Sequence, residues 1–303
     1  MTVYLPIAGL AVNVYVLLAL GGVVGFLSGL FGVGGGFLLT PFLMFLGIPP
    51  GVAVATGANQ VIGASVSGLL VHWKRRNVDL RMGSVLLAGG VAGSVAGVAL
   101  FIWLKRMGQL DLVIALSYVV VLGFIGSTML AESLLALRRR ALAVPPRKRH
   151  RHPFPGLPLK MRFPRSRLYV SALVPLAVGA FGGVLSAIMG VGGGFVMVPL
   201  MIYVLGMPTA VVVGTSLFQI VFVTANVTLL QAISTQTVDV MLMMTLLVGG
   251  VLGAQLGARI GARLQAEHLR LSLALIVLAV AVRLGLDLVL RPEDMFSLEA
   301  RLG

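Results

Sequence analysis

The chain has 303 residues, of which 58% are hydrophobic and 11% charged, and it carries a formal net charge of +14. Soluble domains carry about 25% charged residues, so the composition excludes an ordinary soluble enzyme, a disordered protein and a nucleic-acid-binding module. Neither residues 1–73 nor residues 168–238 contain any Asp, Glu, Lys or Arg, as expected of segments that lie in lipid. The lack of cysteine excludes disulfides, thiolate metal sites and thiol nucleophiles.

Residues 1–137 are predicted to form an N-terminal membrane repeat with five apolar legs. In chain order these are Leu10–Phe31, Phe37–Leu46, Gly51–Val71, Ser84–Leu104 and Leu110–Ala131. Crossing the hydrocarbon core of a bilayer takes about 20 apolar residues in a helix. The second leg would reach only about 15 Å as a helix, so we expect a short, broken leg there.

Residues 138–167 are predicted to form a basic linker. This segment holds 11 of the 23 Lys and Arg residues and six of the 14 prolines. Cytoplasmic loops gather Lys and Arg, so we expect the linker to be cytoplasmic and to contact anionic lipid headgroups. No aromatic or folded platform accompanies the charge, so nucleic acid is not an expected partner.

Residues 168–303 are predicted to form a C-terminal membrane repeat with the same plan. Its legs are Leu168–Met189, Phe195–Leu205, Thr209–Leu230, Thr245–Leu264 and Leu269–Leu290. The two halves also match residue by residue, since Gly25–Phe42 aligns with Gly183–Leu200 around a shared VGGGF core. Further matches lie 158 to 160 residues apart, which indicates an internal repeat the size of a transporter half.

The distribution of charge predicts that the two repeats are inverted. The loop His72–Arg81 has four Lys or Arg residues, whereas its counterpart Gln231–Met241 has none. The positive-inside rule then places equivalent loops on opposite sides, and five legs per half, an odd number, agree with this. We therefore expect an all-α, multi-pass protein of the cytoplasmic membrane with both termini outside. Each short leg would be either a re-entrant turn or a thin crossing.

The glycine segments before the two short legs are the candidate binding site. A ten-residue leg ending at an interface puts Gly34–Gly36 near the bilayer midplane, and inverted symmetry puts Gly192–Gly194 at the same depth. Irregular backbone there is tolerated only where it lines a cavity or is buried in protein. Helix N-termini offer unpaired N–H groups and a partial positive charge, which suits an anion. The same glycines would also suit close packing of helices.

Polar residues of the following legs complete the predicted site, although hydrogen bonds between helices are an alternative role for them. The predicted substrate-binding residues are Gly34, Gly35, Gly36, Thr56, Asn59, Gln60, Gly192, Gly193, Gly194, Thr215, Ser216 and Gln219. No carboxylate, Ser/His/Asp set or metal-ligand cluster falls in the middle of a leg. We therefore expect no catalytic residue, no metal and no cofactor, and a protein that is not an enzyme.

The doubled glycine motif resembles that of the TauE/SafE family of sulfite exporters. The resemblance is carried by Gly32–Phe37 with Pro41 and by Gly190–Phe195 with Pro199, together with the segments around Thr56 and Thr215. It implies a permease that exports a small anionic substrate, such as sulfite or an organosulfonate, across the cytoplasmic membrane. Two alternatives are an importer of an organic sulfonate or other small organic acid, and a non-transporting membrane scaffold or sensor.

Overall fold

The computed structural model describes residues 2–31, 36–141, 158–166, 168–261 and 266–290. Gly34 and Gly35 of the predicted site and the central part of the predicted linker lie outside these ranges.

Ten helices in the described residues account for the ten predicted legs. They are α1 (Val14–Phe31), α2 (Gly36–Phe45), α3 (Pro50–Lys74), α4 (Leu80–Arg106), α5 (Leu110–Ala141), α6 (Leu173–Met189), α7 (Gly194–Tyr203), α8 (Thr209–Ser234), α9 (Val240–Gly261) and α10 (Ala266–Val289). Six of them, α3, α4, α5, α8, α9 and α10, are long and apolar enough to cross a membrane. Helices α2 and α7 have ten residues each, as expected of the short legs. The protein is therefore a mostly helical, multi-pass membrane protein.

Two β-hairpins correct the expectation of an all-α fold. Strand β1 (Thr2–Leu5) pairs antiparallel with β2 (Leu10–Asn13), and β3 (Lys160–Phe163) pairs with β4 (Leu168–Ser171). The legs expected to begin at Leu10 and Leu168 therefore begin later, at Val14 and Leu173. A short apolar run has the same composition in a strand as in a helix, so hydropathy could not separate the two. Regular structure also enters the predicted linker range, because α5 extends to Ala141 and β3 starts at Lys160.

The main helix contacts join one half of the chain to the other. Helix α1 packs against α9, α6 against α4, α3 against α8, and α5 against α10. The five helices of the first half, α1 to α5, correspond in order to α6 to α10 of the second half. Exchanging every helix for its counterpart leaves this set of contacts unchanged. Glycines allow the closest approaches, since a Cβ at Gly93 of α4 would collide with the Ala180 carbonyl of α6. In the same way, a Cβ at Gly253 of α9 would collide with the Gly22 carbonyl of α1.

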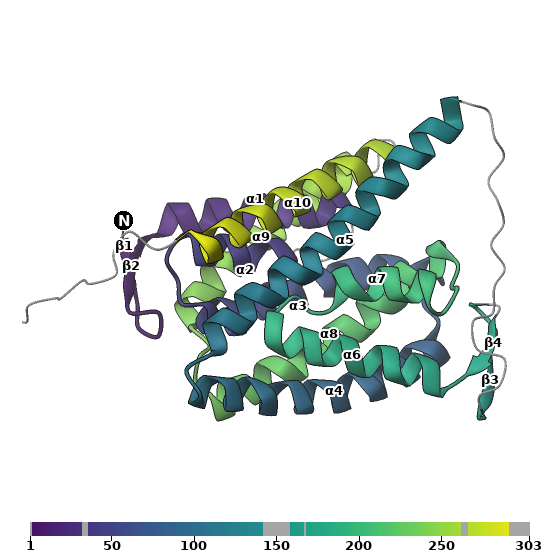
Figure 1. Cartoon of the computed structure of the whole chain (residues 1–303), viewed down its shortest axis with the longest axis horizontal. Helices are drawn as coiled ribbons and strands as arrows, with labels where there is room; N and C mark the ends of the chain where they lie inside the picture. Colours follow the sequence, from purple (N-terminus) through teal and green to yellow (C-terminus); the bar gives the residue numbers. More distant parts are fainter. Residues whose placement is uncertain (1, 32–35, 142–157, 167, 262–265, 291–303) are drawn as a thin grey trace, which may run out of the picture.

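The two hairpins lie at opposite ends of the molecule. Figure 1 shows β1 and β2 at the left end of the helices and β3 and β4 at the right end. Helices α5 and α10 lie side by side and run in opposite directions in the same view.

The short helices begin in the protein interior. Every residue of α2 from Gly36 to Pro41 is buried, and so are Gly194 to Met197 of α7. Their other ends are more open, and Tyr203 at the end of α7 is exposed. The first turns of both short helices are thus the parts most removed from solvent and lipid.

Candidate functional site

The starts of the two short helices meet in the middle of the fold. A Cβ placed on Gly36 would lie 3.0 Å from the carbonyl oxygen of Val191 and 3.2 Å from that of Gly190. Next to them, the rings of Phe37 and Phe195 stack with centroids 4.4 Å apart and planes inclined by 15°. These two phenylalanines occupy the same position in the two VGGGF motifs. The structure therefore brings the second glycine segment together with the described end of the first.

The second glycine segment has a backbone that requires glycine. Gly190, Gly192 and Gly193 have φ values of +66°, +68° and +75°, a region that residues with a Cβ seldom adopt. Gly193 is the N-cap of α7, and no side chain caps this helix. The first N–H groups of an α-helix have no acceptor within the helix. The start of α7 therefore presents N–H groups and the positive end of a helix dipole to its surroundings.

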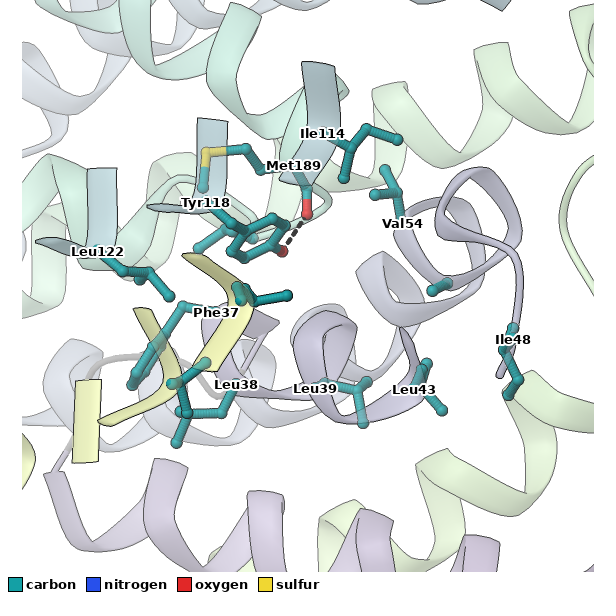
Figure 2. Packing of buried hydrophobic residues seen from close by; sticks show 14 of the residues in the cluster. Phe37, Leu38, Leu39, Leu43, Ile48, Val54, Ile114, Tyr118, Leu122 and Met189 are labelled. Atoms are coloured by element: carbon teal, nitrogen blue, oxygen red, sulfur yellow. Dashed lines mark hydrogen bonds between the residues drawn. The ribbon is translucent and has the colours of Figure 1, made fainter. Parts of the chain in front are cut away.

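Hydroxyl donors satisfy the adjacent carbonyl end of α6. Figure 2 shows the Tyr118 hydroxyl pointing at the Met189 carbonyl, to which it donates a hydrogen bond. The Thr40 hydroxyl donates to the same oxygen at 3.5 Å. Met189 ends α6, so these donors compensate one carbonyl at the negative end of that helix.

Thr224 is the polar side chain that the structure places at the glycines. Its Oγ1 lies 3.0 Å from the Cβ position of Gly192, and this buried hydroxyl has no hydrogen-bond partner among the described residues. Val61 is the contact on α3, because a Cβ on either Gly36 or Gly192 would collide with its methyl groups. The sequence placed Thr224 near the predicted hydroxyl and amide donors, but Thr224 was not among the predicted binding residues. Its repeat counterpart Ser65 is also a buried hydroxyl without a partner among the described residues.

Gln60 and Gln219 occupy equivalent places, beside glycines of the fourth helix of the other half. The Gln60 amide nitrogen donates to the Gly21 carbonyl at 3.1 Å, and a Cβ at Gly250 would collide with this amide. A Cβ at Gly90 would lie 3.0 Å from the Gln219 amide nitrogen. The side-chain oxygens of both glutamines are buried and have no partner among the described residues. These amides are polar groups in the interior, and the contacts described above join them to α1, α4 and α9 rather than to the described glycine segments.

Thr56 and Thr215 form a reciprocal pair of hydrogen bonds between the halves. The Thr56 hydroxyl accepts from the Asp239 N–H at 3.1 Å, and the Thr215 hydroxyl accepts from the Asp79 N–H at 3.0 Å. Both threonines are fully buried. Asn59 and Ser216 instead donate to their own helices, to the carbonyls of Ala55 and Val213. The hydrogen bonds of these four residues therefore do not lead to the described glycines of the two segments.

Asp79 and Asp239 are buried carboxylates that each bind the hairpin of the opposite half. Asp79 Oδ2 accepts from the N–H of Ser166 at 2.9 Å and from its hydroxyl at 2.6 Å. Asp239 Oδ2 accepts from the Ile7 N–H at 3.1 Å. Below, the Asp79 cluster is Asp79, Ser166 and Thr215, and the Asp239 cluster is Asp239, Ile7 and Thr56.

Each carboxylate also caps the helix that follows it. Asp79 Oδ1 accepts from the Met82 N–H at 3.2 Å, and Asp239 Oδ1 accepts from the Leu242 N–H at 3.1 Å. An aspartate before an apolar helix is a signal for an N-cap. The matched Val-Asp pairs at these positions gave that signal, but no pattern indicated that a hairpin would bind the second carboxylate oxygen.

Comparisons with known proteins agree with this architecture. The family model described as sulfite exporter TauE/SafE matches residues 17–284. A probable membrane transporter protein of Xylella fastidiosa is 31% identical over 266 residues, which cover 86% of this chain and 91% of the relative. The probable membrane transporter proteins YunE and YjnA of Bacillus subtilis are 29% and 26% identical, covering 72% and 95% of those relatives and 67% and 86% of this chain.

No solved structure matches the chain. Among the described residues, no group of three or more His, Asp or Glu side chains could hold a metal ion. The family match spans both halves. It includes the glycine segments and both aspartate clusters, apart from Ile7 of the Asp239 cluster. The chain therefore belongs to the sulfite exporter TauE/SafE family and is a multi-pass membrane transporter.

Proposed function

We propose that this transporter exports a small sulfur oxyanion, such as sulfite or an organosulfonate, across the cytoplasmic membrane. In this proposal the anion binds at mid-membrane between the two glycine segments. The observation that carries it is the meeting of two buried helix N-termini, one from each half, beside the Phe37–Phe195 stack. The chain around them is free of charged side chains, since residues 168–238 and 1–73 contain none.

Helix ends can replace the cations that an anion usually needs. Each N-terminus acts as roughly half a positive charge in a region where a buried Lys or Arg would be costly to insert. The Thr224 hydroxyl adds a donor beside Gly192. Tyr118 and Thr40 compensate the Met189 carbonyl, which would otherwise repel an anion at this point.

The arrangement of the two halves supports transport by alternating exposure of this site. The opposite placement of the hairpins and the antiparallel course of α5 and α10 favour inverted repeats. The basic residues of the loop after α3 and of the linker favour an orientation with the linker inside and both termini outside. The site lies on the boundary between the halves, and an aspartate cluster holds them together at each end. Separating the halves at one end would break one cluster and open the site to that side only.

The membrane potential supports the outward direction. An anion that leaves a negative interior gains about 2.3 kcal/mol per charge per 100 mV. Export therefore needs no coupled ion, and the basic cytoplasmic segments would raise the local concentration of anions at the inner face.

Flux of sulfite from liposomes containing the purified full chain tests this proposal. We expect Thr224→Val, which removes only the donor, to slow efflux, because it leaves the anion with one hydrogen bond fewer. Thr228→Val is the matched control: its hydroxyl also lacks a described partner, but no described contact joins it to the glycines. Normal efflux through Thr224→Val, or equal losses in both variants, would place the site elsewhere.

A second pair of variants tests the glycine segment. Gly193→Leu should abolish efflux because it places a side chain at the start of α7, in a backbone with φ of +75°. Gly123→Leu should leave efflux intact, because nothing lies within 4 Å of its Cβ position. A well-folded wild type that carries no sulfite but takes up an organic sulfonate would indicate the importer. Absence of flux for every such anion would indicate a scaffold or sensor.

A further inference from the structure

A cationic cavity lies where the loop between α3 and α4 meets the hairpin of the second half. Its volume is about 310 Å³, and it is lined by Trp73, Lys74, Arg76, Val78, Leu80 and Arg165. The first five residues belong to the first half of the chain and Arg165 belongs to the turn between β3 and β4. The cavity therefore spans the boundary between the halves, next to the Asp79 cluster.

Among the described residues that line this cavity, three are cations and none is a carboxylate. Arg165 is held in place because its guanidinium donates to the Val78 carbonyl, and a guanidinium carries five N–H donors, more than this one acceptor uses. Lys74 and Arg76 are exposed and line the same cavity. The nearby carboxylate of Asp79 is occupied by Ser166 and by the start of α4.

The opposite end of the molecule shows that the fold does not require these cations. At the repeat offset of 158 to 160 residues, Lys74 corresponds to Ser234, Arg76 to Gln236 and Arg165 to Ile7. The backbone nevertheless has the same shape, since Arg76 and Gln236 have φ values of +56° and +49°. The neutral loop closes on its hairpin through Asp239 just as the cationic loop does through Asp79. The charges therefore serve a purpose beyond closing the loop.

We propose that this cavity binds a phosphate group, supplied by an anionic lipid headgroup. Arg and Lys donors from both halves of the chain match the several acceptor oxygens of a phosphate. Trp73 and Leu80 are 49% and 44% exposed, and they give the cavity an aromatic and apolar rim like that of side chains at a membrane interface. A bound phosphate would join Lys74 and Arg76 of one half to Arg165 of the other. It would thereby favour the closed form of this end of the transporter, whichever anion is transported.

Fluorescence of Trp73 provides the test. Trp73 and Trp103 are the only tryptophans, so Trp103→Phe leaves a single reporter in the cavity. Short-chain phosphatidylglycerol is titrated into the detergent-solubilised full chain, with phosphatidylcholine of equal chain length and inorganic phosphate as separate arms. We expect saturable binding of phosphatidylglycerol and little response to phosphatidylcholine. Saturation by inorganic phosphate at similar concentrations would support the phosphate site with a soluble source.

Charge-matched variants separate a built site from general attraction to a basic surface. The double variant Arg76→Gln/Arg165→Gln should weaken binding by about tenfold or more, as expected when charge-assisted hydrogen bonds are lost. Arg81→Gln should change it little, because Arg81 is exposed at the same end but does not line the cavity. If the double variant does not fold, Lys74→Gln serves in its place. Absence of saturable binding in every arm, or equal weakening by Arg81→Gln, would overturn the proposal.

Discussion

The Asp79 and Asp239 clusters use the same backbone geometry with different side chains. In both, a threonine of one half accepts from the aspartate N–H of the other, and a hairpin donates to the carboxylate. At the Asp79 end the hairpin contributes the hydroxyl of Ser166 and the guanidinium of Arg165. At the Asp239 end Ile7 contributes only its N–H. The shared part is what the fold needs at each end, and the added side chains distinguish one end from the other.

Substitution of the packing glycines should lower stability the most, and the loss should be equal in the two halves. Gly93→Ala and Gly253→Ala each push a methyl group into a backbone carbonyl of the partner helix. We expect each to lower the free energy of unfolding by about 3 kcal/mol, the upper range for overpacking. Thermal unfolding in detergent measures this, with Gly123→Ala as the control in open space. A clear difference between the two variants would show that the interfaces α1–α9 and α4–α6 are not equivalent.

Removal of either aspartate should have the next largest effect. Asp79→Ala and Asp239→Ala each abolish an N-cap and leave the N–H of a hairpin residue without its acceptor. We expect each to cost about 2 kcal/mol, the upper range for loss of a cap. Thermal unfolding of both variants, with Asp111→Ala as an exposed control, measures the loss. Tolerance of one substitution but not the other would mean that one cluster contributes no stability.

Substitutions in the two hairpins should cause smaller losses of stability, and these losses should differ between the hairpins. Ser166→Ala removes a hydroxyl that donates to Asp79, so we expect a loss of about 1 kcal/mol. Ile7→Ala keeps the N–H that donates to Asp239 and should leave that cluster intact. Amide hydrogen exchange at the first turns of α4 and α9, measured in each variant, shows which aspartate cluster is weakened. Faster exchange in α9 of the Ile7 variant would contradict this account.

Cysteine labelling should show on which side of the membrane each end of the molecule lies, without changing stability. The chain has no native cysteine, so Arg75→Cys and Gln236→Cys report on one exposed position at each end. Inverted repeats predict that an impermeant thiol reagent added outside cells reacts at position 236 and not at position 75. Equal reaction of both from the outside would contradict the inverted orientation.

The sequence predicted the helices well because lipid makes apolar length a strong signal. It also predicted that the short leg starting near Gly36 would begin close to the second glycine segment, and in the structure a Cβ on Gly36 would lie 3.0 Å from the Val191 carbonyl oxygen. It missed the hairpins, since β1, β2 and β4 are four-residue, mostly apolar segments that composition cannot assign to strand or helix. Strand β3 contains Lys160 and Arg162 and lay within the predicted basic linker. It missed the Asp–hairpin contacts because the two partners lie more than 80 residues apart in the chain.

The direction of side chains also limited what the sequence could predict about the site. The spacing of Thr56 and Gln60 places them near one face of a helix, but it does not reveal which element covers that face. In the structure that face meets α1 and α9, whereas Val61, one residue further on, meets the glycines. One residue along a helix turns the side chain by about 100°, which is enough to exchange one neighbour for another.

The cross-half packing also has a consequence for synthesis. The main partners of α1, α3 and α5 are α9, α8 and α10, all of which are translated later. When the first half has left the ribosome, these three helices are in the membrane with lipid in place of their final neighbours. Lipid tails are as apolar as most of the missing side chains, so contact with lipid costs these helices little solvation free energy except at buried polar residues such as Thr56 and Gln60 of α3. The Asp239 cluster joins the first hairpin to the start of α9, so the N-terminal segment of the chain is fastened only when translation is nearly complete.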